Sequence, residues 1–155
     1  MQDNINNDSL KNIFIEIKNE LTTVAEGHEI YSRSLSGTNG ISFSADKKEK
    51  KELAICFYRY ASLLAEGISN MERPISGLTD IIISADRDGQ QNKLLLCDSL
   101  LTQFGEFKMS TSLFVSKSEQ ILANEDPSPA HLRKLLFEYG YKLNYFNDFL
   151  TKQSF

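Results

Sequence analysis

Hydrophobic positions recur every three or four residues along most of the chain, which is the spacing of one face of an α-helix. The first stripe follows Asp8 and Ser9, either of which can cap a first turn. Its members are Leu10, Phe14, Ile17, Leu21 and Val24. We therefore expect a helix over about 9–26, with His28 continuing its apolar face. Small polar residues and two glycines then predict a loop over 32–40.

A second stripe predicts a helix that begins near Asp46 and ends before Pro74, because proline disfavours helical geometry in the residue preceding it. Its apolar positions are Leu53, Cys56, Phe57, Tyr60, Leu64, Ile68 and Met71. The segment 78–85 is ambiguous, since short apolar runs fit a helix or a buried strand. Leu78, Ile81, Ile82 and Ala85 fit a short helix, which we favour because no second strand is available for pairing.

The longest periodic segment covers about 91–123. Its expected buried face consists of Leu96, Leu100, Phe104, Phe107, either Leu113 or Phe114, and Ile121. An unbroken helix of this length would approach about 50 Å at 1.5 Å per residue. Gly105 and the serine-rich stretch 110–112 are positions where it could bend.

The last helix has the clearest start signal, because Ser128 can cap it and Pro129 suits its first position. Its stripe contains Leu132, Leu136, Tyr139, Leu143, Phe146 and Leu150, and we expect it to run to about Thr151. Four long amphipathic helices and one short helix predict an all-α fold, an antiparallel bundle. We expect one helical domain over 1–155, with residues 1–7 flexible.

Composition narrows the classes of partner. Hydrophobic residues make up 41% and charged residues 25% of the chain, with a net charge of −4. Binders of nucleic acid or of anionic membranes normally present a basic face, so neither partner is expected. No apolar run approaches the roughly 18 residues that span a bilayer, and the N-terminus does not resemble a secretory leader. A basic protein partner is compatible with this charge.

The two cysteines, Cys56 and Cys97, each fall within an apolar helical pattern. We expect buried, reduced thiols, with a disulfide between them or a reactive thiol as alternatives. Reduced thiols and the lack of a leader predict a cytoplasmic protein.

The stretch SADRDGQQ, residues 84–91, resembles part of a calcium loop. Such a loop needs oxygen ligands at positions 1, 3, 5 and 12 and glycine at position 6. With Gly89 at position 6, position 12 is Leu95; with Asp86 at position 1, position 12 is Cys97. We therefore expect a turn in which Gly89 adopts positive φ, and we expect no metal or cofactor here.

Other catalytic or binding patterns are weak. His28 and His131 lie on separate predicted helices without the spaced ligands of a metal set. No nucleophile elbow, phosphate loop or dinucleotide fingerprint occurs. The lysine-rich segment 47–51 is interpreted as a solvated helix start. We expect a protein that is not an enzyme, although an enzyme with scattered residues between helices stays an alternative.

Seven of the sixteen aromatic residues fall between Phe137 and Phe155. Besides the regular stripe, a second stripe repeats strictly every four residues, and its members are Phe137, Tyr141, Tyr145 and Phe149. The last helix can be wedged between several neighbours, or it can bury one stripe and turn the other outward to a partner. Phe155 would extend such an outward patch. Aromatic side chains suit protein interfaces because they bring large contact area at low entropy cost.

These features favour a non-catalytic protein-binding module, and specifically a small cytoplasmic inhibitor or immunity-type protein that neutralises a protein partner. Acidic residues would steer a basic partner, and the candidates are Glu16, Glu20, Asp80, Asp86 and Asp88. Our predicted partner-binding residues are Phe137, Tyr141, Tyr145, Phe149, Asp86 and Asp88. The alternatives are a homo-oligomeric helical scaffold, including a homodimer, and the enzyme named above.

Overall fold

A computed structural model describes residues 2–36, 47–125, 127–153 and 155 of the chain, without the side chains of residues 2–7, 36 and 47–49. All regular structure in this part is helical, which confirms the all-α prediction. The helices are α1 (Gln2–Ser36), α2 (Lys47–Ser76), α3 (Leu78–Arg87), α4 (Gln91–Leu122) and α5 (Pro129–Thr151). Among these helices, none is both long and apolar enough to cross a membrane.

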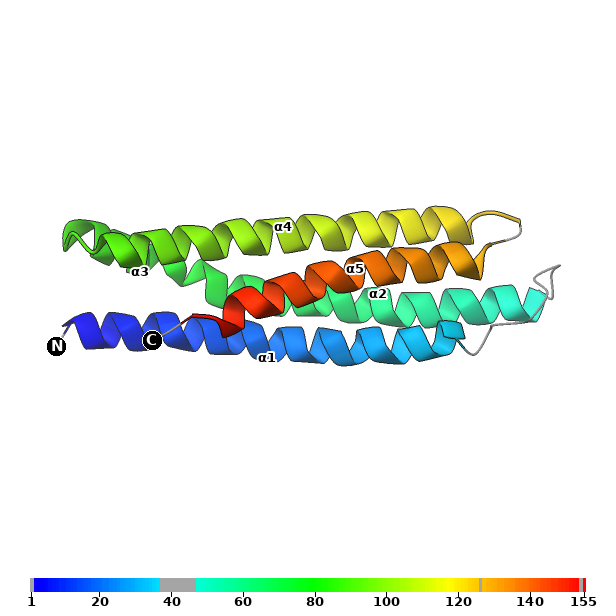
Figure 1. The fold of residues 1–155 in the computed structure, drawn as a ribbon, viewed down its shortest axis with the longest axis horizontal. Helices are drawn as coiled ribbons and strands as arrows, with labels where there is room; N and C mark the ends of the chain where they lie inside the picture. Colours follow the sequence, from blue (N-terminus) through cyan, green and yellow to red (C-terminus); the bar gives the residue numbers. More distant parts are fainter. Residues whose placement is uncertain (1, 37–46, 126, 154) are drawn as a thin grey trace.

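The four long helices lie side by side as an elongated bundle, and successive long helices run in opposite directions (Figure 1). Around the bundle α1 packs against α2, α2 against α4, α4 against α5, and α5 against α1. The short α3 lies at one end, where it joins α2 to α4 (Figure 1). The bundle follows from the amphipathic stripes, because each long helix has one apolar face to bury.

Several helix boundaries differ from the prediction. The helix α1 begins at Gln2 and continues to Ser36, although its first seven residues carry no apolar stripe. Each added residue gains one backbone hydrogen bond once a helix is nucleated, so polar residues can extend it. The flexibility of residues 1–7 stays a prediction. The remainder of the predicted loop, 37–40, and the predicted start of the second helix at Asp46 lie outside the described residues.

The predicted end of the second helix before Pro74 is wrong, because α2 includes this proline and ends at Ser76. A proline beyond the first turn of a helix lacks the amide proton for the bond to residue i−4 and crowds the carbonyl of that residue, so it weakens the helix where it occurs. Here Pro74 lies in the last turn, and its carbonyl oxygen accepts a hydrogen bond from the Gly77 amide at 3.0 Å. The proline therefore coincides with the helix end without breaking the helix.

The segment 78–85, which fitted either a helix or a strand, is helical as we favoured. It forms α3, which buries Leu78, Ile81 and Ala85. It ends in the turn predicted from SADRDGQQ, where Gly89 has φ of 69°. The Gln90 amide donates to the Ala85 carbonyl at 2.8 Å, and the Gly89 amide donates to the Asp86 carbonyl at 3.3 Å. This pair of bonds is the Schellman arrangement, which needs a left-handed residue and therefore favours glycine.

The core runs the length of the bundle and contains the stripes predicted from the sequence. In α5 all six inward positions are less than 5% exposed, and they are Leu132, Leu136, Tyr139, Leu143, Phe146 and Leu150. Each fully buried large apolar side chain contributes about 1.5–3 kcal/mol relative to an exposed one. The helix α4 is continuous through Gly105 and the serine-rich stretch. Both cysteines are free, with Cys97 buried and Cys56 half-buried.

Candidate interaction face on α4 and α5

The helix α5 carries two aromatic stripes that face in different directions. Its inward stripe is buried in the core, whereas Phe137, Tyr141 and Tyr145 are 67%, 63% and 61% exposed. The rings of Phe137 and Tyr141 also contact each other edge to face, with centroids 5.1 Å apart. Of the two arrangements compatible with the sequence, the structure has one stripe inward and one outward.

The fourth predicted member, Phe149, lies elsewhere. A row of residues spaced by four drifts by about 40° per step around a helix, so Phe149 has turned away from Phe137 toward the core. Its ring lies 6.0 Å from that of Phe14 on α1. Phe155 also packs on Phe14, at 5.1 Å, and does not extend the outward stripe as predicted.

The helix α4 contributes two exposed side chains that were not among the predicted partner-binding residues, Met109 at 75% and Leu113 at 55% exposure. The sequence left open whether Leu113 or Phe114 is buried; the structure buries Phe114. We call the surface formed by Met109, Leu113, Phe137, Tyr141 and Tyr145 the α4–α5 face. The i, i+4 spacing of Met109 and Leu113 was the available signal, but only the packing shows that they point outward.

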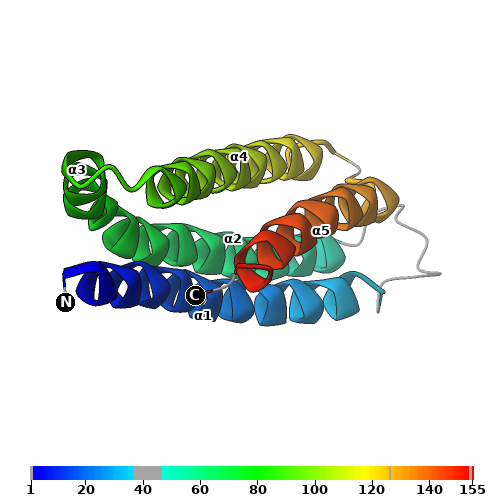
Figure 2. The same cartoon turned by 60° about the vertical axis from the view of Figure 1, so that its left-hand side comes forward.

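A groove of about 840 Å³ runs between the two helices beneath this face. Met109 and Leu113 line it from α4, and Tyr141 and Tyr145 line it from α5. The ribbons of α4 and α5 diverge toward the C-terminal end of α5 (Figures 1 and 2), and the residues that line the groove from α5 lie between Tyr141 and Phe146. Core rings lie beneath it, since Phe107 and Phe146 also line the groove and stack on each other with centroids 5.0 Å apart.

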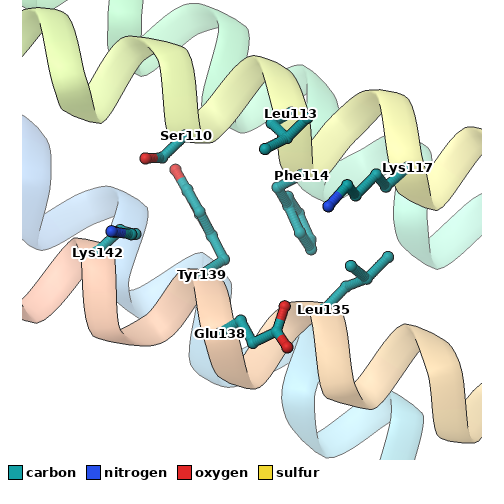
Figure 3. A pocket seen from close by; sticks show the side chains of 8 residues that line it. All are labelled: Ser110, Leu113, Phe114, Lys117, Leu135, Glu138, Tyr139 and Lys142. Atoms are coloured by element: carbon teal, nitrogen blue, oxygen red, sulfur yellow. The ribbon is translucent and has the colours of Figure 1, made fainter.

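A smaller cavity of about 120 Å³ adjoins the groove, with Ser110, Leu113 and Lys142 lining both. Phe114 and Tyr139 point into it from opposite helices (Figure 3) and stack with centroids 4.7 Å apart. Lys117 from α4 and Glu138 from α5 stand on either side of its opening (Figure 3). Tyr139 donates a hydrogen bond to the Thr111 hydroxyl at 2.7 Å, while Thr111 donates to the Phe107 carbonyl.

The charged side chains along the groove and cavity balance one another: they are Glu106, Lys117, Glu138 and Lys142. This surface therefore has an apolar centre and a mixed polar rim, the usual anatomy of a protein interface. It does not have the strongly acidic character that would attract a basic partner over a distance.

The predicted acidic residues do not belong to this face. Asp86 and Asp88 are exposed at the α3–α4 turn, at one end of the bundle, whereas the face follows the length of α4 and α5 (Figure 1). The Asp88 carboxylate pairs with the neighbouring Arg87 at 3.4 Å. The predicted site therefore divides into an aromatic part on α5 and a separate acidic corner.

Ligands for a metal do not gather in the described residues, where no group of three or more histidine, cysteine or acidic side chains occurs. His28 instead lies among the rings of α2 and α5. Its Nδ1 is 3.1 Å from the Tyr60 hydroxyl, and its ring centroid is 6.3 Å from that of Tyr139. Burial lowers the pKa of His28 below its ordinary value of 6.5, while the Glu29 carboxylate acts in the opposite direction.

Comparison of the chain with protein-family models, with curated proteins and with solved structures found no match. The candidate site therefore stands on its own geometry.

Proposed function

We propose that this protein is a non-catalytic binding module that occupies a protein partner through the α4–α5 face. Within this class we favour a small cytoplasmic inhibitor or immunity-type protein, which neutralises its partner by covering it. Such a role needs a stable scaffold and a contact surface, and it needs no catalytic group.

The observation that carries the proposal is the exposed aromatic cluster of Phe137, Tyr141 and Tyr145. At roughly 200 Å² per aromatic side chain, three rings exposed by about two-thirds provide roughly 400 Å² of surface. Patches of this size are near the upper end for monomeric proteins and commonly mark binding sites. Met109 and Leu113 enlarge the same patch from the neighbouring helix.

Affinity purification from cells that naturally contain the protein tests this proposal. Wild-type chain is compared with a Tyr141→Ala/Tyr145→Ala double variant and with Tyr58→Ala as a matched control. Tyr58 is also exposed, at 53%, but lies on α2 outside the face. We expect to capture one partner protein in stoichiometric amount, and we expect it to bind purified wild type and Tyr58→Ala equally well. Its affinity for the double variant should be at least about tenfold lower, because removal of an aromatic anchor from an interface commonly costs more than 1 kcal/mol.

Circular dichroism and thermal unfolding confirm that each variant is folded before binding is measured. The proposal is wrong if no partner binds stoichiometrically, or if the partner binds the double variant as well as wild type. A homo-oligomeric scaffold and a motif-free enzyme are the alternative functions that such an outcome would favour.

A further inference from the structure

The charges on the α4–α5 face suggest what covers it. Two glutamates and two lysines line the groove and cavity, so the surface has no excess charge for a strongly acidic or basic partner. A balanced set of charges is instead compatible with self-association, provided that opposite charges meet when the surface faces a copy of itself.

The register of α4 and α5 can be read from two ring contacts. Phe107 lies against Phe146, and Phe114 lies against Tyr139, with centroids 5.0 Å and 4.7 Å apart. The two helices are antiparallel (Figure 1), so one step forward along α4 corresponds to one step back along α5. Every residue of one helix can thus be assigned a height relative to the other.

In this register the outward side chains of the two helices alternate in height. In order along the bundle they are Glu106, Tyr145, Met109, Tyr141, Leu113, Phe137 and Lys117. Each aromatic residue of α5 is therefore within one residue of the height of an outward α4 residue, with Tyr145 near Met109, Tyr141 near Leu113 and Phe137 near Lys117. The rings remain exposed within one chain, and so do Met109 and Leu113, so the single chain does not cover this surface.

We propose that a second copy of this chain covers the face, related to the first by a two-fold axis parallel to α4 and α5. Rotation about such an axis leaves every height unchanged and exchanges the two sides of the face. The helix α5 of each copy then lies over α4 of the other, in antiparallel orientation. Tyr145 and Tyr141 of each copy then lie against Met109 and Leu113 of the other, which removes these apolar side chains from water.

The same rotation pairs the charges. Lys117 of one copy faces α5 of the other near the heights of Phe137 and Glu138. An ion pair with Glu138 and a cation–π contact with Phe137 both become available, and the symmetry forms each of them twice. Tyr145 can likewise offer its hydroxyl to Glu106 of the second copy. The arrangement buries the apolar centre and opposes Lys117 to Glu138, which carry opposite charges.

This inference rests on the proposed function only in treating the α4–α5 face as a protein-binding surface. It assigns that surface a second copy of the chain as occupant when no other partner is bound. The two proposals are tested separately, because dimer formation is measured with purified protein alone and partner binding needs a second protein.

Sedimentation equilibrium of the purified full chain, over roughly 1–200 μM, covers the affinities of small interfaces. We expect the average mass to rise from one chain toward two. Lys117→Glu and Glu138→Lys should each weaken dimerisation about tenfold or more, because each opposes like charges across the interface. The double variant Lys117→Glu/Glu138→Lys restores opposite charges, so its dimerisation constant should return to within about threefold of wild type.

Glu119→Lys is the matched control, because Glu119 lies on α4 in the groove toward α2, outside the face. It should dimerise like wild type. A monomer at every concentration overturns the proposal, as does a dimer that the single reversals leave intact. Failure of the double variant to recover, with its fold confirmed by circular dichroism, overturns the proposed register. None of these outcomes depends on whether another protein is captured.

Discussion

At the scale of single residues, two pairs of polar side chains join neighbouring helices through the core, whereas the buried hydroxyls of Tyr31 and Ser118 have no hydrogen-bond partner among the described residues. His28 on α1 pairs with Tyr60 on α2, and Thr111 on α4 pairs with Tyr139 on α5. A buried polar group costs free energy unless it is hydrogen-bonded. The two pairs therefore offset the cost of burying their hydroxyl groups and the imidazole ring among aromatic side chains. The partners are 32 and 28 residues apart in sequence, which is why no local pattern shows them.

The pairing of His28 predicts a pH dependence of stability. Burial lowers its pKa in the folded state below 6.5, so the unfolded chain binds more protons in the interval between the two values. The contribution of neutral His28 to the free energy of unfolding should therefore be fully present above about pH 6.5. It should decline as the pH falls through this interval. The groups facing His28 are Tyr60 and Tyr139, with Glu29 adjacent in sequence.

Urea unfolding at pH 8 and at pH 5.5 measures this decline. We expect His28→Gln to show a smaller loss of unfolding free energy between the two pH values than wild type. His131→Gln is the control, since His131 is exposed at the start of α5. An equal pH dependence in wild type and His28→Gln would contradict the assignment of the decline to His28.

At the scale of helices, two termini follow their local sequence closely, the start of α5 and the end of α3. The Ser128 side chain accepts a hydrogen bond from the His131 amide at 3.3 Å, and Pro129 occupies the first turn of α5. Gly89 ends α3 with the positive φ that the turn requires. These features were predictable because a cap depends on four or five consecutive residues. The helix end before Pro74 was predicted wrongly because a proline makes a helix boundary in the preceding residue probable without requiring it, and α2 continues to Ser76.

Loss of the α5 cap should destabilise the protein modestly. Ser128→Ala removes the acceptor for the His131 amide and should lower the unfolding free energy by about 1 kcal/mol. Ser99→Ala, at an exposed position inside α4, should be neutral or slightly stabilising because alanine favours helix interiors. Chemical denaturation of both variants makes the comparison, and equal destabilisation would contradict a specific capping role for Ser128.

At the scale of the whole molecule, packing decides which of the two α5 stripes is core and which is surface. Three helices could have enclosed α5 on all sides, and both stripes would then be buried. Among the described helices, α5 instead packs against α1 and α4 only, so none of them covers its outward side. The adjacent residues Tyr145 and Phe146 consequently differ completely, with exposures of 61% and 1%.

This difference predicts opposite behaviour for two neighbouring substitutions. Phe146→Ala leaves a cavity beside Phe107 and should cost about 3–5 kcal/mol of stability. Tyr145→Ala removes an exposed side chain and should change stability by no more than about 0.5 kcal/mol. Equilibrium denaturation of both variants measures the contrast. Comparable losses would show that the two stripes are not divided between core and surface as described.

The sequence by itself determined the presence of the helices, the cap of α5, the turn at Gly89 and most of the inward stripes, because these depend on residues within one or two turns of each other. It also identified the outer aromatic row, but it assigned Phe149 and the acidic turn to the same site. Only the tertiary structure showed that Phe149 and the acidic turn lie apart from the outward aromatic residues. It also placed Met109 and Leu113 in the α4–α5 face and set the register of α4 against α5. Those properties depend on which helices are neighbours, and hydrophobic periodicity within one helix carries no information about its neighbour.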